Sequence, residues 1–474
     1  MRGGRSFIVL IVIAAALGAY IYFVENKRDL ADPAVKKDKV FADLEPGKIE
    51  EIEVHASAGD TTRVKKDGEK WQIVSPEATD ADSNEISTLT STLASLDVQR
   101  VVDEAPKAVK DFGLEPPRFT VAFRQSGETA MKKLEIGTKS PTGADLYARV
   151  EGQPRLLLLS SFIEDSLNRT TFNLQDKTVL KFDRTGADAL KTEVSGAPAL
   201  SFTRKSDQWR LTAPIDARAD FSAVDGLVQQ VYSAKMKSVV SKTEPTAADL
   251  KKYGLDKPQA VVIVGAGSSR ASLAIGGKMD DTSLYARDLS RPAVFTVEPS
   301  LLDGVKKTAD DLRVKDTFEF RTFTARGVDL TLDGKAFTYA KVKPPAEKKD
   351  DKKDEKKDDK ATPPPPPPPA PAEVWKVMKP AEKDVDQMKI TDLLTDLSNL
   401  KAEKFADKPV TGGQELVVVA RFGDDGNTKE ERVTLRKVGD VAHAIRAGEP
   451  GAAVIATADF DKIVKQLKEL AEIK

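Results

Sequence analysis

The stretch that decides the fold reads WQIVSPEATDAD at Trp71–Asp82, and it recurs as WRLTAPIDARAD at 209–220 and as WKVMKPAEKDVD at 375–386. Each copy has a Trp, a polar residue and an aliphatic residue, then a Pro, with an Asp six positions after the Pro. One such phrase carries little information, but three in register indicate an internal repeat. The signature residues are Trp71, Pro76, Asp82, Trp209, Pro214, Asp220, Trp375, Pro380 and Asp386.

A second landmark gives the same repeat length. LYAR begins at Leu146 and again at Leu284, and this offset equals the one between Trp71 and Trp209. The third copy is degenerate, because it lacks the GLxxP turn, and the step from Trp209 to Trp375 is longer. The extra length is accounted for by a Lys/Asp- and Pro-rich insert at 343–372, whose flanks match the two strands of a hairpin in the earlier copies. We expect the charged part of the insert to be disordered and the prolines to form polyproline II, as a spacer or as a partner-docking segment.

The predicted fold class is α+β, with three tandem repeats of about 140 residues behind an N-terminal transmembrane helix. Each repeat is expected to hold a hairpin-rich sheet, with a hairpin turn at Asp67-Gly68 in the first repeat. Each should also hold two main helices, an amphipathic one after the signature Asp and a closing one, which is Ser161–Asn168 in the first repeat. A loose tandem array of compact domains and a continuous stack both fit this pattern. The expected segments are a cytoplasmic N-terminus at 1–6, a transmembrane anchor at 7–24, a tether at 25–39, and repeats at 40–175, 176–315 and 316–474.

Composition excludes several classes of function. The formal net charge is −1, so the chain lacks the clustered basic surface that nucleic-acid binding requires. There are no cysteines and only two histidines, His55 and His443, which removes disulfides, thiolate metal sites and Cys nucleophiles. The sequence contains none of the common catalytic or nucleotide-binding motifs in its proper context. We therefore expect no enzymatic activity, no cofactor and no metal.

The N-terminus predicts a membrane anchor. Phe7–Val24 is an uncharged, mostly apolar run. As a helix it would be about 27 Å long, just enough to span the hydrocarbon core of a bilayer. A cleaved signal peptide is the alternative, but the run exceeds the usual apolar core and no A-x-A site follows it. Arg2 and Arg5 favour a cytoplasmic N-terminus. The sequence thus predicts a single-pass protein of the cytoplasmic (inner) membrane, with most of the chain on the periplasmic side.

The signature residues have structural and functional interpretations. The Trp lies in a strand with an aliphatic residue two positions on, which favours core packing, although an exposed platform for glycan is the alternative. Each Asp stands directly before an amphipathic helix, which favours an N-cap over a catalytic carboxylate. Arg149, Arg287 and Arg446 lie in the LYAR, LYAR and HAIR segments. They are candidates to bind a carboxylate ligand, and salt-bridged surface arginines are the alternative.

Together with the N-terminal apolar run, the motifs WxhxxP, AD before a helix, FGLEPP and YGLDKP, an IG strand and a YAR strand resemble the bacterial family called domain of unknown function 4340. The resemblance covers the first two repeats and is weaker in the third, which lacks the GLxxP turn. It implies no catalytic residues. It implies an accessory or scaffold role beside an ABC-type transport complex, with a permease or auxiliary protein as partner. A periplasmic module that binds glycan or peptidoglycan is the alternative.

Overall fold

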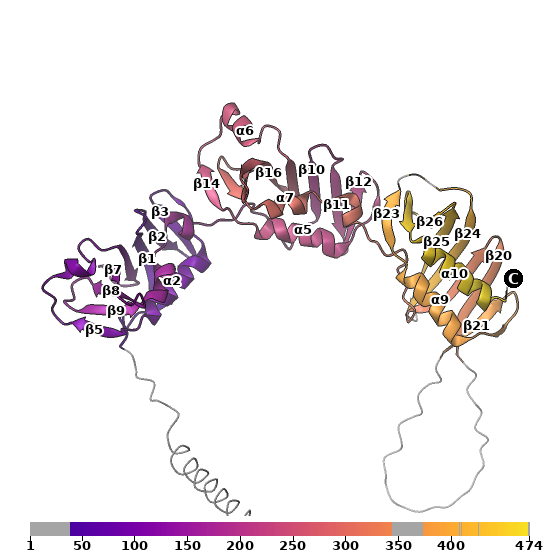
Figure 1. Ribbon diagram of the computed structural model, residues 1–474, viewed down its shortest axis with the longest axis horizontal. Helices are drawn as coiled ribbons and strands as arrows, with labels where there is room; N and C mark the ends of the chain where they lie inside the picture. Colours follow the sequence, from indigo (N-terminus) through magenta and orange to yellow (C-terminus); the bar gives the residue numbers. More distant parts are fainter. Residues whose placement is uncertain (1–37, 344–372, 407, 409, 425, 473–474) are drawn as a thin grey trace, which may run out of the picture. The chain divides into compact units, whose positions relative to one another are not determined.

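A computed structural model describes residues 38–343 and 373–472, except 407, 409 and 425. Strands dominate this part of the chain, with 44% strand and 22% helix. They form three antiparallel sheets of nine strands each, which follow one another along the sequence (Figure 1). The chain divides into two compact units, Met1–Lys177 with the first sheet and Thr178–Lys474 with the second and third.

The first sheet has the strand order β4-β3-β2-β1-β6-β7-β8-β9-β5. It consists of two meanders that meet where β1 pairs with β6, and β5 closes the far edge beside β9. Its elements are η2 (Pro46–Lys48), β1 (Ile49–His55), β2 (Thr61–Asp67), β3 (Lys70–Ser75), β4 (Thr79–Asp80), α2 (Ser83–Ser95), β5 (Arg100–Asp103), η3 (Val109–Phe112), β6 (Phe119–Gln125), β7 (Lys132–Lys139), β8 (Asp145–Val150), β9 (Leu156–Ser160), η4 (Ser161–Ile163), α3 (Glu164–Leu167) and α4 (Thr171–Leu174).

The second sheet repeats this topology, in the order β13-β12-β11-β10-β15-β16-β17-β18-β14. Its elements are β10 (Ala189–Val194), β11 (Leu200–Lys205), β12 (Gln208–Ala213), β13 (Ala217–Arg218), α5 (Phe221–Ser233), β14 (Ser238–Ser241), α6 (Ala247–Tyr253), β15 (Ala260–Ala266), β16 (Ser269–Asp280), β17 (Ser283–Asp288), β18 (Val294–Val297), α7 (Pro299–Val305) and α8 (Ala309–Leu312).

The third sheet has the order β22-β21-β20-β19-β24-β25-β26-β27-β23. Its elements are β19 (Ala325–Leu332), β20 (Lys335–Val342), β21 (Val374–Lys379), β22 (Lys383–Asp384), α9 (Gln387–Asn399), β23 (Ala402–Ala406), β24 (Gln414–Asp424), β25 (Asn427–Val438), β26 (Val441–Arg446), β27 (Ala452–Ile455) and α10 (Thr457–Leu470). The insert predicted at 343–372 lies, apart from Lys343, outside the described residues. The strands on either side of it are hydrogen-bonded, with Val342 opposite Val374.

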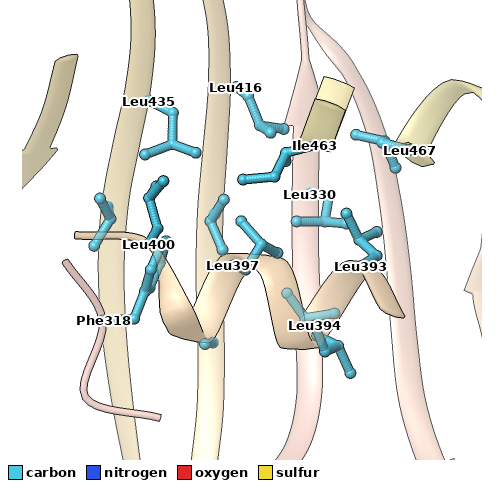
Figure 2. Packing of buried hydrophobic residues seen from close by; sticks show 14 of the residues in the cluster. Phe318, Leu330, Leu393, Leu394, Leu397, Leu400, Leu416, Leu435, Ile463 and Leu467 are labelled. Atoms are coloured by element: carbon cyan, nitrogen blue, oxygen red, sulfur yellow. The ribbon is translucent and has the colours of Figure 1, made fainter. Parts of the chain in front are cut away.

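One long helix packs on each sheet and forms its core. The helices α2, α5 and α9 have 13 residues each, and apolar side chains three and four positions apart line the face that meets the strands. In the third sheet, leucines of α9 point toward leucines of the strands, and α10 adds further apolar side chains beside them (Figure 2). The labelled residues are Phe318, Leu330, Leu393, Leu394, Leu397, Leu400, Leu416, Leu435, Ile463 and Leu467.

The prediction of two main helices in every repeat is wrong. The closing helix expected at Ser161–Asn168 is a single 3-10 turn followed by the four-residue α3, and its counterpart α7 has seven residues. Segments this short are not stable helices by themselves, because nucleation costs more than a few hydrogen bonds return. Only the third sheet has a second long helix, α10. The first two repeats are therefore nine-stranded sheets with one main helix, the third has two, and strand pairing dominates all three.

The predicted transmembrane helix and inner-membrane location are also corrected. Between residues 38 and 472, leaving out the undescribed positions, no helix is both long and apolar enough to cross a membrane. The longest of these helices, α10, has 14 residues and buries only one face. At 1.5 Å per residue it is about 21 Å long, shorter than the hydrocarbon core of a bilayer. The anchor expected at 7–24 lies outside the described residues.

The signature Asp is the N-cap of the 13-residue helix in each repeat. Asp220 accepts a hydrogen bond from the backbone N–H of Ala223 at 2.8 Å, and Asp82 and Asp386 each cap their helices in the same way. The cap residue is held from outside as well, because the N–H groups of Asp82 and Asp220 donate to Leu174 and Leu312 of their own repeats, both at 2.8 Å.

We expect Asp220→Ala to destabilise helix α5 by about 1 kcal/mol, because Ala cannot accept the bond from Ala223. Asn is as good a cap as Asp, so Asp220→Asn should lie within a few tenths of a kcal/mol of the native chain. Hydrogen exchange of the α5 amides at fixed pH measures the difference. Equal protection in the Ala and Asn variants would contradict the assignment of the cap.

Candidate functional site

Two of the three signature tryptophans are buried. Trp209 is 3% exposed and Trp375 is 5% exposed, while Trp71 is half-buried at the edge of the first core. The indole Nε1 of Trp209 has no hydrogen-bond partner among the described residues. Lys341 lies over the ring of Trp375, 5.5 Å from the ring. These side chains lie in packed strands and do not form an exposed aromatic platform.

The signature prolines and aspartates complete a joint between strand and helix. The peptide bonds before Pro76, Pro214 and Pro380 are all cis. The chain then turns through a two-residue edge strand into the Asp cap. Each signature set belongs to its own sheet, and each of the three carboxylates caps the helix of that sheet. Asp220 also borders an open depression near Arg313 and Lys401, but its carboxylate faces the helix amide that it caps.

The three candidate arginines are all paired with carboxylates. Arg149 donates to Glu135 at 2.9 and 2.6 Å, and Arg287 donates to Glu244 at 2.5 Å. Arg446 donates to Glu431 at 2.5 Å. A free arginine that could bind a ligand carboxylate is therefore not found at any of these three positions.

The LYAR, LYAR and HAIR segments predict that the three arginines occupy equivalent positions in their sheets. The strand pairing shows that Arg446 does not. Arg149 lies opposite Glu135 and Arg287 opposite Ala274, at the same place in the first two sheets. Strand pairings followed outward from the signature Trp place Arg446 at the position of Asp288 instead. One residue of register moves a side chain to the other face of a strand. Arg446 therefore lies on the face of β26 that carries the buried Ala442 and Ala444.

Arg446 belongs to a charge network that joins the second and third sheets. Arg218 of β13 donates to Glu449 at 2.5 Å and to Glu319 at 3.4 Å. Arg446 donates to Glu319 at 2.8 Å as well as to Glu431, whose side chain is 2% exposed. Two cations thus meet three carboxylates, from both sheets of one compact unit. We call Arg218, Glu319, Glu431, Arg446 and Glu449 the junction network.

The backbone is part of the same joint. Glu431 accepts hydrogen bonds from the N–H groups of Glu319 and Phe320 at 3.0 and 2.8 Å. Arg218 donates to the carbonyl of Asp316 at 3.2 Å, and Arg446 donates to that of Thr317 at 3.3 Å. The segment between the two sheets is therefore held by side chains from both of them.

Charged neighbours of the network are also paired. Arg210 of β12 donates to Asp216 at 2.5 Å, and this bond lowers the pKa of the Asp216 carboxyl and raises the pKa of Arg210.

In the third core, burial raises the pKa of Tyr339 to about 12, so this hydroxyl remains protonated at neutral pH.

Cavities of different size border the junction network. One has a volume of about 30 Å³, enough for only one or two water molecules. Another, of about 430 Å³, is lined by Arg218 and Glu319 of the network. Within the described residues, no group of three or more His, Cys, Asp or Glu side chains could hold a metal ion. The network is thus suited to holding the two sheets together.

Sequence reasoning missed most of this network. Arg218 and Glu449 are 231 residues apart, and Arg446 and Glu319 are 127 residues apart. Sequence motifs with short spacing cannot predict contacts between residues so far apart. Among the network residues, only Arg446 carries a sequence signal, the weak HAIR match, and that match gives the wrong register.

The burial of the tryptophans has a direct spectroscopic consequence. In variants that keep one Trp and replace the other two by Phe, we expect acrylamide to quench Trp71 more strongly than Trp209 or Trp375, because only Trp71 is half-exposed. Stern–Volmer constants measured under native conditions give the ranking. Quenching of Trp209 as strong as that of Trp71 would contradict its place in the core.

Comparison with known proteins gives a family match. Two stretches, 71–210 and 209–416, match the family described as Domain of unknown function (DUF4340). The first match begins at the signature Trp in β3 and ends in β12, and the second begins in β12 and ends in β24. No curated protein shows a significant match.

Two solved structures of the DNA polymerase sliding clamp from Pseudomonas aeruginosa show a weak likeness. The structure with ligand has 9% identity, covers 88% of this chain and 93% of the clamp, and has a TM-score of 0.15. The other has 10% identity, 87% and 92% coverage, and a TM-score of 0.17. Scores this low carry no argument about fold or function. The family matches, by contrast, run with one small overlap from residue 71 to residue 416, and the protein belongs to the DUF4340 family.

Proposed function

We propose that the chain is a non-catalytic accessory or scaffold subunit of an ABC-type transport complex. The observation that carries this proposal is the junction network, in which two arginines and three glutamates join the second and third sheets. A scaffold needs sheets held in fixed positions, so that partners meet them with a fixed spacing. Charged groups that already satisfy one another can serve this purpose and leave none of the five for catalysis.

The residues that recur in all three repeats support the same proposal. The signature Trp, Pro and Asp form the joint between strand and helix, so the repeated phrase serves the fold. The transport complex enters through the resemblance to DUF4340 proteins, which implies a permease or auxiliary protein as partner. Burial of Trp209 and Trp375 disfavours the alternative of a glycan-binding module.

Removing one partner of the buried ion pair in the junction network should reduce the stability of the third sheet. Arg446→Ala leaves Glu431 buried without its cation, and we expect the third sheet to lose about 3 kcal/mol of stability. The two backbone N–H groups on Glu431 place this estimate at the low end of the usual range. Hydrogen exchange of the third-sheet amides, resolved by segment, measures the loss.

Arg432→Ala is the matched control, because Arg432 is the exposed neighbour of Glu431 and should change stability by less than about 0.5 kcal/mol. Adding Glu431→Gln to Arg446→Ala should recover part of the lost stability, because Gln leaves no unpaired buried charge. Equal effects of Arg446→Ala and Arg432→Ala would rule out the network as the joint.

Purification of the tagged full chain from detergent extracts of its native cells tests the function itself. We expect an ABC-type permease, ATPase or auxiliary protein to be enriched over an untagged control, and the Arg446→Ala chain to retain less of it than the Arg432→Ala chain. Enrichment of no transport component would overturn the proposal. Selective retention of the chain on purified sacculi, without any transport component, would favour the glycan-binding alternative instead.

A further inference from the structure

The second sheet has a cavity of about 440 Å³ at one end of its strands. Three segments form its walls, namely the turn between β10 and β11, the bend after β12, and the connection from α7 to α8. Phe405, from β23 in the same compact unit, closes one side. This volume lies in the range of small-molecule sites. Among the residues that line it, Pro214 belongs to the signature and none belongs to the junction network.

In the first repeat, hydrogen bonds hold the corresponding turn. The turn between β1 and β2 is fastened to the segment around α4, since Asn168 accepts from the N–H of Ser57 at 2.9 Å and donates to its hydroxyl at 2.7 Å. The backbone N–H of Thr171 donates to the carboxylate of Asp60 at 3.0 Å, and the hydroxyls of Thr171 and Thr62 are hydrogen-bonded at 2.7 Å. We call these four hydrogen bonds the rim latch.

The second repeat cannot form this latch. Its positions follow from the offset between Trp71 and Trp209, as the matching pairs Val54–Thr62 and Thr192–Leu200 show. Asp60 and Thr62 are replaced by Pro198 and Leu200, Thr171 by Ala309, and Asn168 by Lys306. None of Pro198, Leu200 and Ala309 has a polar side chain. The turn therefore loses all four bonds, and the cavity lies where they would be.

The side chains that line the cavity are mainly apolar or cationic. The walls are mostly apolar, with Val194, Ala197, Pro198, Leu200, Pro214, Ile215, Ala309 and Phe405. The cations Lys306, Lys307 and Arg313 also line the cavity. Lys306 donates to Gln259 at 3.3 Å, and Arg313 lies over the ring of Phe405 at 3.7 Å.

Three cations outnumber the one carboxylate at the cavity. The one carboxylate among the lining residues, Asp310, accepts the backbone N–H of Phe405 at 3.3 Å. Thr192, on the floor, is 1% exposed, and its hydroxyl has no hydrogen-bond partner among the described residues. The corresponding residue of the first repeat is Val54, so this hydroxyl is a feature of the second repeat. An apolar interior with lysines at the rim suits a ligand with an apolar body and an anionic head.

We propose that this cavity binds an amphiphile with an anionic head group and an unbranched alkyl chain, with the chain against the apolar walls and the head at Lys306 and Lys307. Both lysines are exposed, so the charged head keeps its contact with water. Each methylene that enters the cavity should strengthen binding about fourfold. The inference stands apart from the scaffold role, because it uses no residue of the junction network, and Pro214 is the one signature residue among those that line the cavity.

Calorimetric titration of the full chain with decanoate, octanoate and decanol tests the proposal. We expect decanoate to bind at least tenfold more tightly than octanoate, because two more methylenes are buried. Decanol, which keeps the chain and lacks the charge, should bind more weakly than decanoate. No binding of decanoate at millimolar concentration would overturn the proposal. Equal binding of decanol and decanoate would overturn the assignment of an anionic head.

Two sets of variants locate the ligand. The pair Lys306→Glu and Lys307→Glu should weaken decanoate at least tenfold, whereas Lys251→Glu with Lys252→Glu, exposed on α6, makes the same change in net charge and should leave it within twofold. Ala197→Trp fills the cavity from an exposed turn, so we expect it to abolish binding in a folded chain.

A variant that transfers the rim latch gives the most direct test. Pro198→Asp, Leu200→Thr, Lys306→Asn and Ala309→Thr together restore the residues of the first repeat, and decanoate binding should be lost while the circular dichroism spectrum stays native. If the four-residue variant does not fold, Ala197→Trp decides the question alone. Binding unchanged within twofold in Ala197→Trp would place decanoate elsewhere and overturn the proposal.

Discussion

The structure depends on covering a nine-stranded sheet with a helix that is too short for it. Helices α2, α5 and α9 have 13 residues each, about 20 Å at 1.5 Å per residue. Nine strands at about 4.8 Å spacing span about 38 Å. Each helix also leads the chain from the strand at one edge of the sheet to the strand at the other edge. The Asp cap fixes where it starts, and the rest of the apolar face must be covered by later segments, α3 and α4, α7 and α8, or α10.

This constraint explains which parts of the fold the sequence reveals. The amphipathic helices were predictable because their apolar residues recur at three and four positions, and the hairpin before Trp71 because Asp67-Gly68 marks a tight turn. The covering segments were not predictable in the same way. Ser161–Asn168 forms a 3-10 turn and one four-residue α-helix, because so short a segment gains too few hydrogen bonds to sustain a helix by itself.

The candidate site was less predictable than the fold, because its contacts join distant residues. The LYAR and HAIR segments align by letters, yet strand pairing shifts Arg446 by one residue relative to Arg287. That single step places Arg446 beside Glu431 and the segment that joins the sheets. Only the pairing ladder, counted from the signature Trp, distinguishes the two registers. A pattern of letters can reveal that a strand exists, while the face to which its charged residue points depends on its neighbours.

Differences between the repeats are therefore more informative about function than their shared phrase. Trp, Pro and Asp recur because every sheet needs the same joint, so their recurrence shows how the chain is built. The rim of the sheet has no such constraint. The first repeat closes it with four hydrogen bonds, and the second replaces their side chains by apolar ones and a lysine and has a cavity there. The third lengthens a hairpin with its insert and moves an arginine onto the core-facing side of β26. Duplication keeps the interactions that position the helix and leaves the strand ends free to acquire separate roles, so a site in such a chain belongs where one copy departs from the others.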